Sequence, residues 1–180
     1  SNVSHSLSES GHLNERFESC HKGLRVLKNH FSDVTALCDA SPEQLLKVKD
    51  ELSPVDFNRC RYIVEEMQRF NQAKKFLQTG DMLSYGRLMY QTHEGMSTLY
   101  DISCKELEIL IGFSKQHPEI IGARMMGGGY GGCTLNLVRK SKVNEITKEV
   151  TQYYNRLAGL PVSIYTVNFT DGVGIINDPG

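Results

Sequence analysis

The feature that most constrains the fold of this chain is a glycine-rich stretch close to residue 130. Five of the six residues from 127 to 132 are glycines, and Tyr130 is the sixth. Glycine has no Cβ and adopts positive φ without strain, so this density indicates that backbone atoms lie where side chains would not fit. A ligand-free hairpin turn is the less favoured interpretation, because a tight hairpin needs only about one or two glycines. We therefore expect positive φ at one or more of these glycines and a second backbone or a substrate close by.

Two common nucleotide-binding motifs are excluded by the residues that follow this stretch. The glycines at positions 127, 129 and 132 have the spacing of the dinucleotide-binding fingerprint, which requires a helix after the third glycine. Here the residues from Thr134 to Val138 alternate between polar and apolar, as in a half-buried strand. A Walker-type phosphate loop is excluded as well, since neither Gly-Lys-Ser nor Gly-Lys-Thr follows the glycines.

Length and composition indicate one domain over residues 1–180. The chain has 180 residues, is 39% hydrophobic and contains no apolar run close to the length that spans a membrane. With 20 basic and 21 acidic residues it has no electrostatic signature of a nucleic-acid-binding protein, so neither nucleic acid nor membrane is an expected partner. Its five cysteines form no C-x-x-C pair, so we expect no metal site and no disulfide framework. Because no signal-peptide pattern precedes residue 20, we expect a cytoplasmic protein.

Helical signals dominate the first two thirds of the chain. Ser41 and Ser53 each precede a proline, a pattern typical of an N-cap followed by the first helical residue, and Gly80 is expected to end the second of these helices. Further helices are predicted from Asn14 to Leu27, from Asp81 to Thr98, from a capping box at Ser103-Cys104-Lys105-Glu106 to a point before Pro118, and from Val143 to Leu157. The apolar stripe expected to face the core in the helix after Ser53 consists of Ile63, Met67, Phe70, Ala73 and Leu77.

Strand signals gather late in the chain. Short strands are predicted at Thr134–Val138, at Pro161–Asn168 and, after a turn at Asp171-Gly172, at Gly172–Ile176. Residues 1–7 also read as the end of an extended segment. The expected fold class is therefore α+β, with helices packed on one face of a small antiparallel sheet.

Few polar residues suggest chemistry by their spacing alone. His93 and Glu94 could form an acid–base pair, but neighbours on a helix point in different directions, so a surface or capping histidine is favoured. No Ser/His/Asp arrangement can be assembled from spacing, and the methionine-rich helices are interpreted as core.

Three arginines could hold phosphates through forked hydrogen bonds: Arg16, Arg59 and Arg61. Isolated arginines on helices more often pair with carboxylates such as Glu65 or Glu66, and we favour that interpretation.

Beyond these physical signals, residues 122–134 resemble motif three of the galactokinase branch of the GHMP small-molecule kinases. That motif runs Gly-Ala/Ser-Arg-Met-Thr-Gly-Gly-Gly-Phe-Gly-Gly-Cys-Thr, and the chain departs from it at Met126 and Tyr130. Other segments resemble the family in the same order, namely Ser1–Leu7, Arg59–Glu66, Gly80–His93 and Tyr100–Leu107. Since Ser1–Leu7 corresponds to a segment in mid-chain of the family, we favour a native sequence that begins inside a strand over a remnant of cloning.

The resemblance implies a ferredoxin-like GHMP kinase C-terminal domain of a two-domain enzyme. Such an enzyme uses ATP and Mg²⁺ to phosphorylate the 1-hydroxyl of galactose. The family's phosphate loop, its sugar-selecting motif and its catalytic Asp and Arg belong to the N-terminal half, which is the implied partner. No catalytic residue is expected here, so the chain alone should be inert, bind no cofactor and tend to self-associate. The loop implied to line the active site consists of Gly127, Gly128, Gly129, Tyr130, Gly131 and Gly132.

The chain departs from the family pattern at positions implied to lie close to the substrates. His12 stands where many members carry a sugar-contacting Tyr, Thr98-Leu99 replaces an acidic pair, and Met126 removes a hydroxyl. Each change removes a hydrogen-bonding group. Two alternatives to a galactose kinase therefore stay open: a kinase for a related sugar such as a 2-acetamido hexose, and a non-catalytic sugar sensor.

Overall fold

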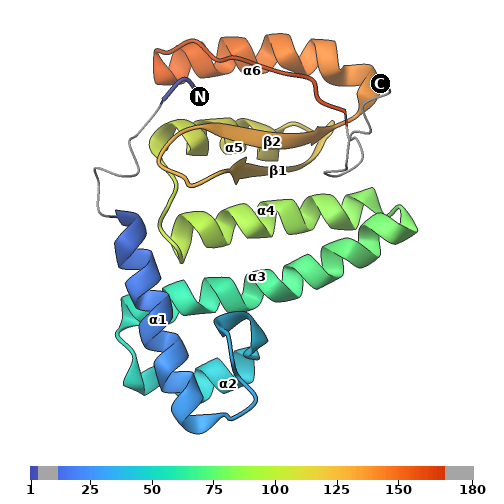
Figure 1. Ribbon diagram of the computed structural model, residues 1–180. Coiled ribbons are helices and arrows are strands. Elements are labelled where there is room, and N and C mark those ends of the chain that lie inside the picture. The colour runs from blue at the N-terminus through green and yellow to red at the C-terminus, as the bar shows by residue number, and fades with distance from the viewer. Residues whose placement is uncertain (4–11, 169–180) are drawn as a thin grey trace, which may run out of the picture.

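The computed structural model describes residues 1–3 and 12–168 (Figure 1). Its elements in chain order are α1 His12–His30, η1 Leu37–Asp39, α2 Pro42–Lys47, η2 Lys49–Glu51, α3 Pro54–Thr79, α4 Met82–Thr98, α5 Lys105–Gln116, β1 Ile120–Met126, β2 Cys133–Val138, η3 Lys140–Lys142 and α6 Val143–Ala158. The predicted helices therefore all form. Over these described ranges, none of the helices combines the length and the apolar character that crossing a membrane requires.

The predicted caps of α2 and α3 are confirmed. The Ser41 hydroxyl accepts a hydrogen bond from the Gln44 amide, and the Gln44 side chain accepts one from the Ser41 amide, which completes a capping box. The Ser53 hydroxyl accepts from the Asp56 amide at 3.1 Å. Gly80 ends α3 with a φ of 73°, the left-handed conformation typical of helix C-termini.

The predicted capping box at the start of α5 is wrong. The N-cap residue is Cys104, whose side chain makes no cap hydrogen bond. Ser103 lies one residue earlier and its hydroxyl donates to the Glu108 carboxylate at 2.5 Å instead. The four-residue pattern is present in the sequence, but the helix begins one residue too late for the Ser103 hydroxyl to reach the amides of the first turn.

The sheet is an antiparallel hairpin of β1 and β2, in which Ala123 faces Asn136 and Met125 faces Thr134. The strand predicted at Thr134–Val138 is β2. No strand is predicted at β1, because burial on both sides leaves this segment without the polar–apolar alternation that marks a strand. The strand predicted at residues 161–168 is wrong: this segment continues from α6 without strand pairing. The turn at residues 171–172 and the strand at residues 172–176 lie outside the described residues.

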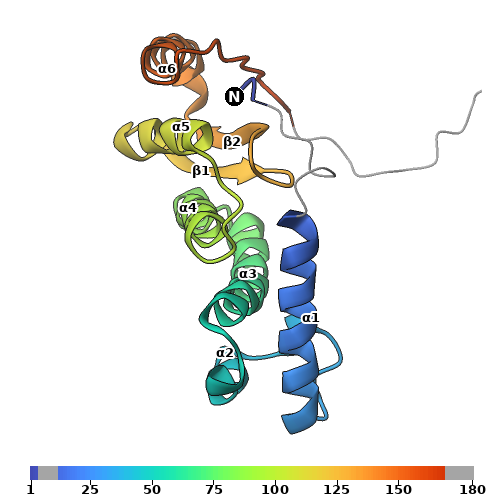
Figure 2. The same ribbon diagram turned by 90° about the vertical axis from the view of Figure 1, so that its left-hand side faces the viewer.

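The helices and the hairpin are stacked in layers that both views show. The hairpin, with α5 beside it, lies between α6 and α4, and α3, α1 and α2 follow beyond α4 (Figures 1 and 2). Two glycines let the backbones of α4 and β1 touch. A Cβ on Gly86 would lie 2.0 Å from the Ile121 carbonyl oxygen, and one on Gly122 would lie 2.4 Å from the Gly86 Cα. The α+β class with a small antiparallel sheet is confirmed.

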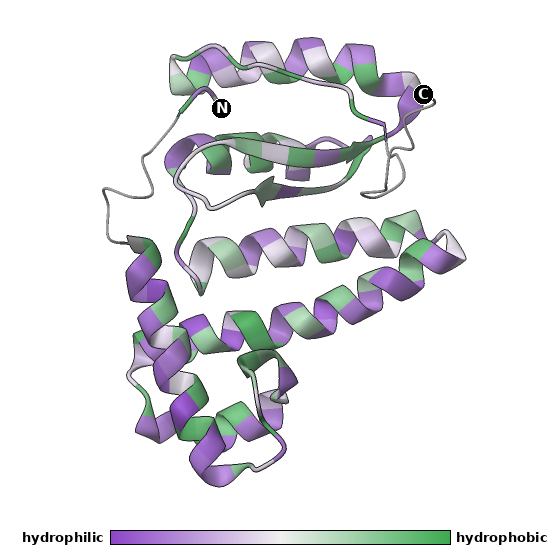
Figure 3. Ribbon diagram, viewed as in Figure 1, coloured by the Kyte–Doolittle hydropathy of each residue, from purple (hydrophilic) through white to green (hydrophobic). Residues whose placement is uncertain are grey.

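Within the described ranges, most of the buried apolar residues form three clusters. The largest fills the space among α1, η1, α2 and α3, and a second packs β1 against α5 and α6. The third consists of Ile102, Leu107 and Met125, and Tyr130 of the glycine-rich loop packs against it. Apolar and polar residues alternate along the helices, as expected for elements with one buried side (Figure 3).

The apolar stripe predicted to face the core in α3 is only partly buried. Phe70 and Leu77 are 53% and 50% exposed, whereas the buried residues of α3 are Cys60, Tyr62 and Val64. The reason is the length of the helix, 26 residues. Its first half lies against α1 and α2 as well as α4, but its second half has only α4 beside it (Figure 1).

Candidate functional site

The glycine-rich loop, residues 127–132, closes the β1–β2 hairpin. Its φ angles are 89° at Gly127, 87° at Gly129, 148° at Gly131 and 84° at Gly132, which confirms the prediction of positive φ. Tyr130 also has a positive φ, of 56°, a conformation that is uncommon for a residue with a side chain. Strain of this kind persists only where surrounding contacts fix it.

The backbones that approach the loop most closely belong to the chain itself. A Cβ on Gly129 would lie 2.0 Å from the Ile102 carbonyl oxygen, and one on Gly131 would lie 2.5 Å from that of Val3. The space around Gly127 is different, because nothing described lies within 4 Å of the position of its Cβ. Gly129 and Gly131 thus serve internal packing, while the outer edge of the loop at Gly127 is open.

Tyr130 fastens the loop to the segment between α4 and α5. Its amide donates to the Ile102 carbonyl at 2.8 Å and its hydroxyl donates to the Asp101 carbonyl at 2.9 Å. The Arg16 guanidinium lies 5.5 Å from the centre of the tyrosine ring, within the range of a cation–π contact. Burial raises the pKa of Tyr130, so its phenol stays protonated and acts as a donor.

Arg16 supports the same segment from α1. It is 2% exposed, its Nε donates to the Tyr100 carbonyl at 3.2 Å, and its Nη2 lies 3.1 Å from the Asp101 carboxylate and also bonds the Asp101 carbonyl. These bonds hold Asp101, which has a φ of 55°. Arg16 therefore positions backbone under the loop, a role that its spacing did not indicate.

The two other candidate arginines bond to protein groups. Arg61 pairs with Glu65 at 2.6 Å, which confirms the favoured interpretation. Arg59 donates to the Glu15 carbonyl at 3.2 Å and to the Ser19 hydroxyl at 3.0 Å, so it links α3 to α1. Both are thus engaged in helix contacts.

The prediction of a surface or capping histidine at position 93 is wrong. His93 is 1% exposed; its Nδ1 accepts from the Met125 amide at 3.3 Å, and its Nε2 lies 3.1 Å from the Glu108 carboxylate. Glu94 points elsewhere and pairs with Lys115 at 3.2 Å. Burial lowers the pKa of His93, although the nearby Glu108 opposes that shift, so the neutral imidazole is favoured.

The three departures from the family pattern fall on different elements. His12 is the first residue of α1, and its side chain lies outside what the structure describes. The Thr98 hydroxyl donates to the Glu94 carbonyl at 2.7 Å, and Leu99 caps α4. Met126 ends β1 and is 46% exposed beside the loop.

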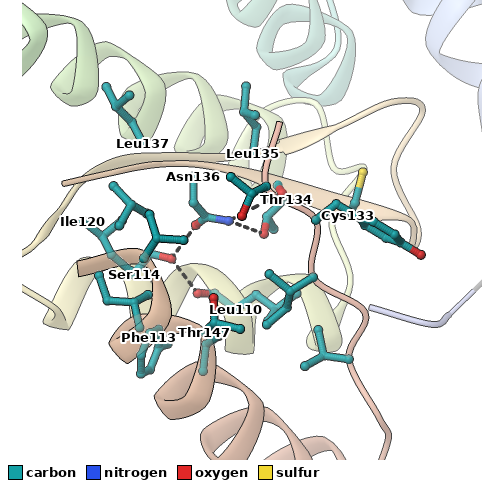
Figure 4. Close-up of a pocket in the computed structure, with 18 of the residues that line it drawn as sticks. Leu110, Phe113, Ser114, Ile120, Cys133, Thr134, Leu135, Asn136, Leu137 and Thr147 are labelled. Atoms are coloured by element: carbon teal, nitrogen blue, oxygen red, sulfur yellow. Dashed lines mark hydrogen bonds between the residues drawn. The ribbon is translucent and has the colours of Figure 1, made fainter. Parts of the chain in front are cut away.

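A cavity of about 290 Å³ lies on another side of the hairpin, among β2, α5, α6 and residues 162–167 (Figure 4). Three of its polar groups bond to one another: the Ser114 hydroxyl donates to Asn136 at 2.8 Å, and the Asn136 amide donates to the Thr134 hydroxyl at 3.0 Å. No carboxylate, lysine, arginine or histidine is among its described lining residues, and nor is any residue of the loop. This lining suits packing better than acid–base chemistry. In the described ranges, moreover, no group of three or more His, Cys, Asp or Glu could hold a metal ion.

Comparison with known proteins gives a consistent result. The family model described as GHMP kinases C terminal matches residues 73–156. A galactokinase from Roseiflexus sp. (strain RS-1) is 31% identical over 178 residues, which cover 99% of this chain and 45% of the relative. A galactokinase from Thermotoga neapolitana is 34% identical over 174 residues, covering 96% and 47% respectively.

A solved structure agrees with these relatives. The crystal structure of Lactococcus lactis galactokinase complexed with galactose is similar with a TM-score of 0.85 and 30% identity, over 91% of this chain and 42% of that one. The chain therefore spans less than half the length of each of these proteins.

Proposed function

Because residues 73–156 match the model of the GHMP kinase C-terminal family, we propose that this chain forms the C-terminal domain of a galactokinase. The intact enzyme would transfer the γ-phosphoryl group of ATP to the 1-hydroxyl of galactose. The observation that carries this proposal is the loop itself. Its sequence resembles motif three of the family, and it takes a positive-φ conformation on a scaffold similar to that of a galactokinase.

Phosphoryl transfer requires little covalent chemistry from the protein and depends on the positioning of the reacting groups. The loop suits such a role. Its inner side is fixed to Ile102 and Val3, while Gly127 presents open backbone on which a phosphate loop or a substrate can lie closely. We assign residues 127–132 to the floor of the active site, and we place His12 near the sugar.

In the described ranges no group of three or more His, Cys, Asp or Glu could enclose a metal ion. The chain also lacks the glycine-lysine signature of a phosphate-binding loop. We therefore assign ATP, Mg²⁺ and the catalytic groups to the N-terminal half, the proposed partner. The chain alone is proposed to be inert. All five cysteines are free thiols, which supports a reducing compartment such as the cytoplasm.

The test compares the 180-residue chain with its complete natural polypeptide, each supplied with ATP, Mg²⁺ and either galactose or a 2-acetamido galactose. We expect turnover with galactose by the complete protein and none by the chain alone. Turnover only with the acetamido sugar would replace galactose by that substrate. Binding of sugar and ATP without transfer by the complete protein would favour the sensor, and turnover by the chain alone would refute the assignment of catalysis to the other half.

A further inference from the structure

His93 connects three elements at Met125, two residues before the glycine-rich loop. It lies on α4, its Nδ1 is 3.3 Å from the amide nitrogen of Met125 in β1, and its Nε2 is 3.1 Å from Glu108 in α5. Glu108 also accepts a hydrogen bond from the Ser103 hydroxyl at 2.5 Å. The imidazole is buried whereas the Glu108 side chain is 47% exposed, so the network runs from the surface to β1.

These contacts fix the tautomer of the imidazole. A ring nitrogen that accepts from a backbone amide carries no proton, so in the neutral form the proton resides on Nε2 and is donated to Glu108. Burial alone would raise the pKa of Glu108, but hydrogen bonds from Ser103 and Ser97 and the nearby His93 together lower it, so the acceptor is ionised. The carboxylate thus orients the ring, and the ring holds the Met125 amide.

The Met125 side chain is fully buried, and its amide donates a hydrogen bond to a side chain of α4. Removing one partner of such a bond leaves a buried donor unsatisfied, and this cost favours a shift of the strand end that gives the amide a new partner. Met125 is two residues before Gly127, where the open edge of the loop begins. A displacement of β1 here would be passed on to the loop.

We propose that His93 is a positioning residue that sets the place of the glycine-rich loop through the Met125 amide. Its consequence for turnover rests on the galactokinase function proposed above. The effect on the loop itself does not depend on that function.

Two variants separate the two hydrogen bonds of the ring. His93→Asn places an oxygen near the position of Nδ1 and can keep the Met125 bond, whereas His93→Gln places a donor near the position of Nε2 and can keep only the Glu108 bond. His117 offers a matched control, because its Nδ1 also accepts a backbone amide, that of Glu119 at 3.2 Å, and its Nε2 also lies 3.2 Å from a carboxylate, Glu149. The control variant is His117→Gln, in α5's C-cap and away from the loop.

Amide hydrogen exchange in the 180-residue chain tests the proposal without any substrate. We expect His93→Gln to speed exchange at Met125 and across residues 126–132 by about tenfold or more, given the cost of an unsatisfied buried amide. His93→Asn should stay within about threefold of the wild type, given how variable single-bond contributions are, and His117→Gln should leave these amides unchanged. Unchanged exchange in His93→Gln, or equal acceleration in both His93 variants, would overturn the proposal.

Kinetics of the complete protein add a second readout. We expect His93→Gln to lower kcat with little change in KM, and His93→Asn to restore most of the loss. If the wild-type complete protein shows no turnover, the proposed function fails while the exchange result still decides the role of His93. If His93→Gln does not fold, ¹⁵N chemical shifts of the wild-type imidazole decide instead: a protonated Nε2 with an accepting Nδ1 supports the proposal, and a protonated Nδ1 refutes it.

Discussion

Gly127 and Gly129 have nearly the same φ, 89° and 87°, but very different surroundings. An added Cβ meets nothing described within 4 Å at Gly127, and the Ile102 carbonyl oxygen at 2.0 Å at Gly129. Gly127→Ala should therefore lower the free energy of unfolding by about 1–2 kcal/mol, from backbone strain alone. Gly129→Ala should add a further loss of about 1–3 kcal/mol from overpacking. Denaturant titration of both variants measures the difference, and equal losses would contradict the role assigned to Ile102.

His93 also predicts how stability depends on pH. Its pKa is lowered from 6.5, so between the folded value and 6.5 the unfolded chain binds more protons than the folded one. Stability due to His93 is therefore present above pH 6.5 and is lost as the pH falls toward the folded pKa, by at most about 1.4 kcal/mol per pH unit.

The groups that act on His93 are Glu94, Glu108 and Lys115, and Glu108 titrates in a lower range because its own pKa lies below its usual value. Unfolding free energies of the wild type and His93→Asn, measured from pH 5 to 8, isolate the histidine. The difference between the two should change only below about pH 6.5. A difference that is constant with pH would show that the pKa of His93 is the same in the folded and unfolded chain.

The positive φ values of the loop could be predicted because glycine content reports directly on backbone conformation. The groups that approach the loop could not, since Ile102 and Val3 are distant in sequence and carry no signal of their own. The burial and the partners of His93 could not be predicted for a related reason. The sequence offers Glu94 as an adjacent acid–base partner, whereas the carboxylate that His93 contacts is that of Glu108, 15 residues away on another helix.

At the scale of elements, a substitution at the N-cap of α3 tests whether the local sequence signals that predict the helices also stabilise the folded chain. Ser53→Ala removes the hydroxyl that accepts from the Asp56 amide at 3.1 Å, so it should lower the free energy of unfolding by about 1 kcal/mol. Thr79→Ala, at the other end of α3, removes only hydrogen bonds from a hydroxyl to carbonyls of the last turn. It should change the free energy of unfolding by less than about 0.5 kcal/mol. Thermal unfolding of both variants measures this contrast. Equal effects would indicate that the cap contributes nothing specific.

Local sequence signals predict where each helix begins more accurately than they predict which side of the helix is buried. Ser41, Ser53 and Gly80 act within one turn of sequence, so their effects could be read directly. Burial depends on neighbours that sequence spacing does not contain, which is why Phe70 and Leu77 are exposed although their periodicity is helical. The unpaired segment at residues 161–168 is a similar case, because its alternation indicates extended chain but cannot supply a partner strand.

For the whole molecule, the exposed large apolar side chains fall into two sets of interest. The loop-side set is Leu13, Phe17 and Met126, and the turn-side set is Leu77 and Leu83, on either side of the α3–α4 turn. Met126 directly precedes the glycine-rich loop, and Phe17 follows Arg16, which lies on the Tyr130 ring. If the N-terminal half of the proposed kinase covers the loop, it should cover the loop-side set and leave the turn-side set exposed.

A hydrophobic dye distinguishes the two sets. The 180-residue chain should bind the dye and self-associate, and the double substitution Phe17→Gln with Met126→Gln should lower both. In the complete protein that substitution should leave dye binding unchanged, because the partner half already covers these side chains. Leu77→Gln with Leu83→Gln serves as the matched control and should lower dye binding in both proteins, since nothing is expected to cover that turn. Fluorescence titration with sedimentation measures these effects, and an equal decrease for the loop-side pair in both proteins would contradict an interface at the loop.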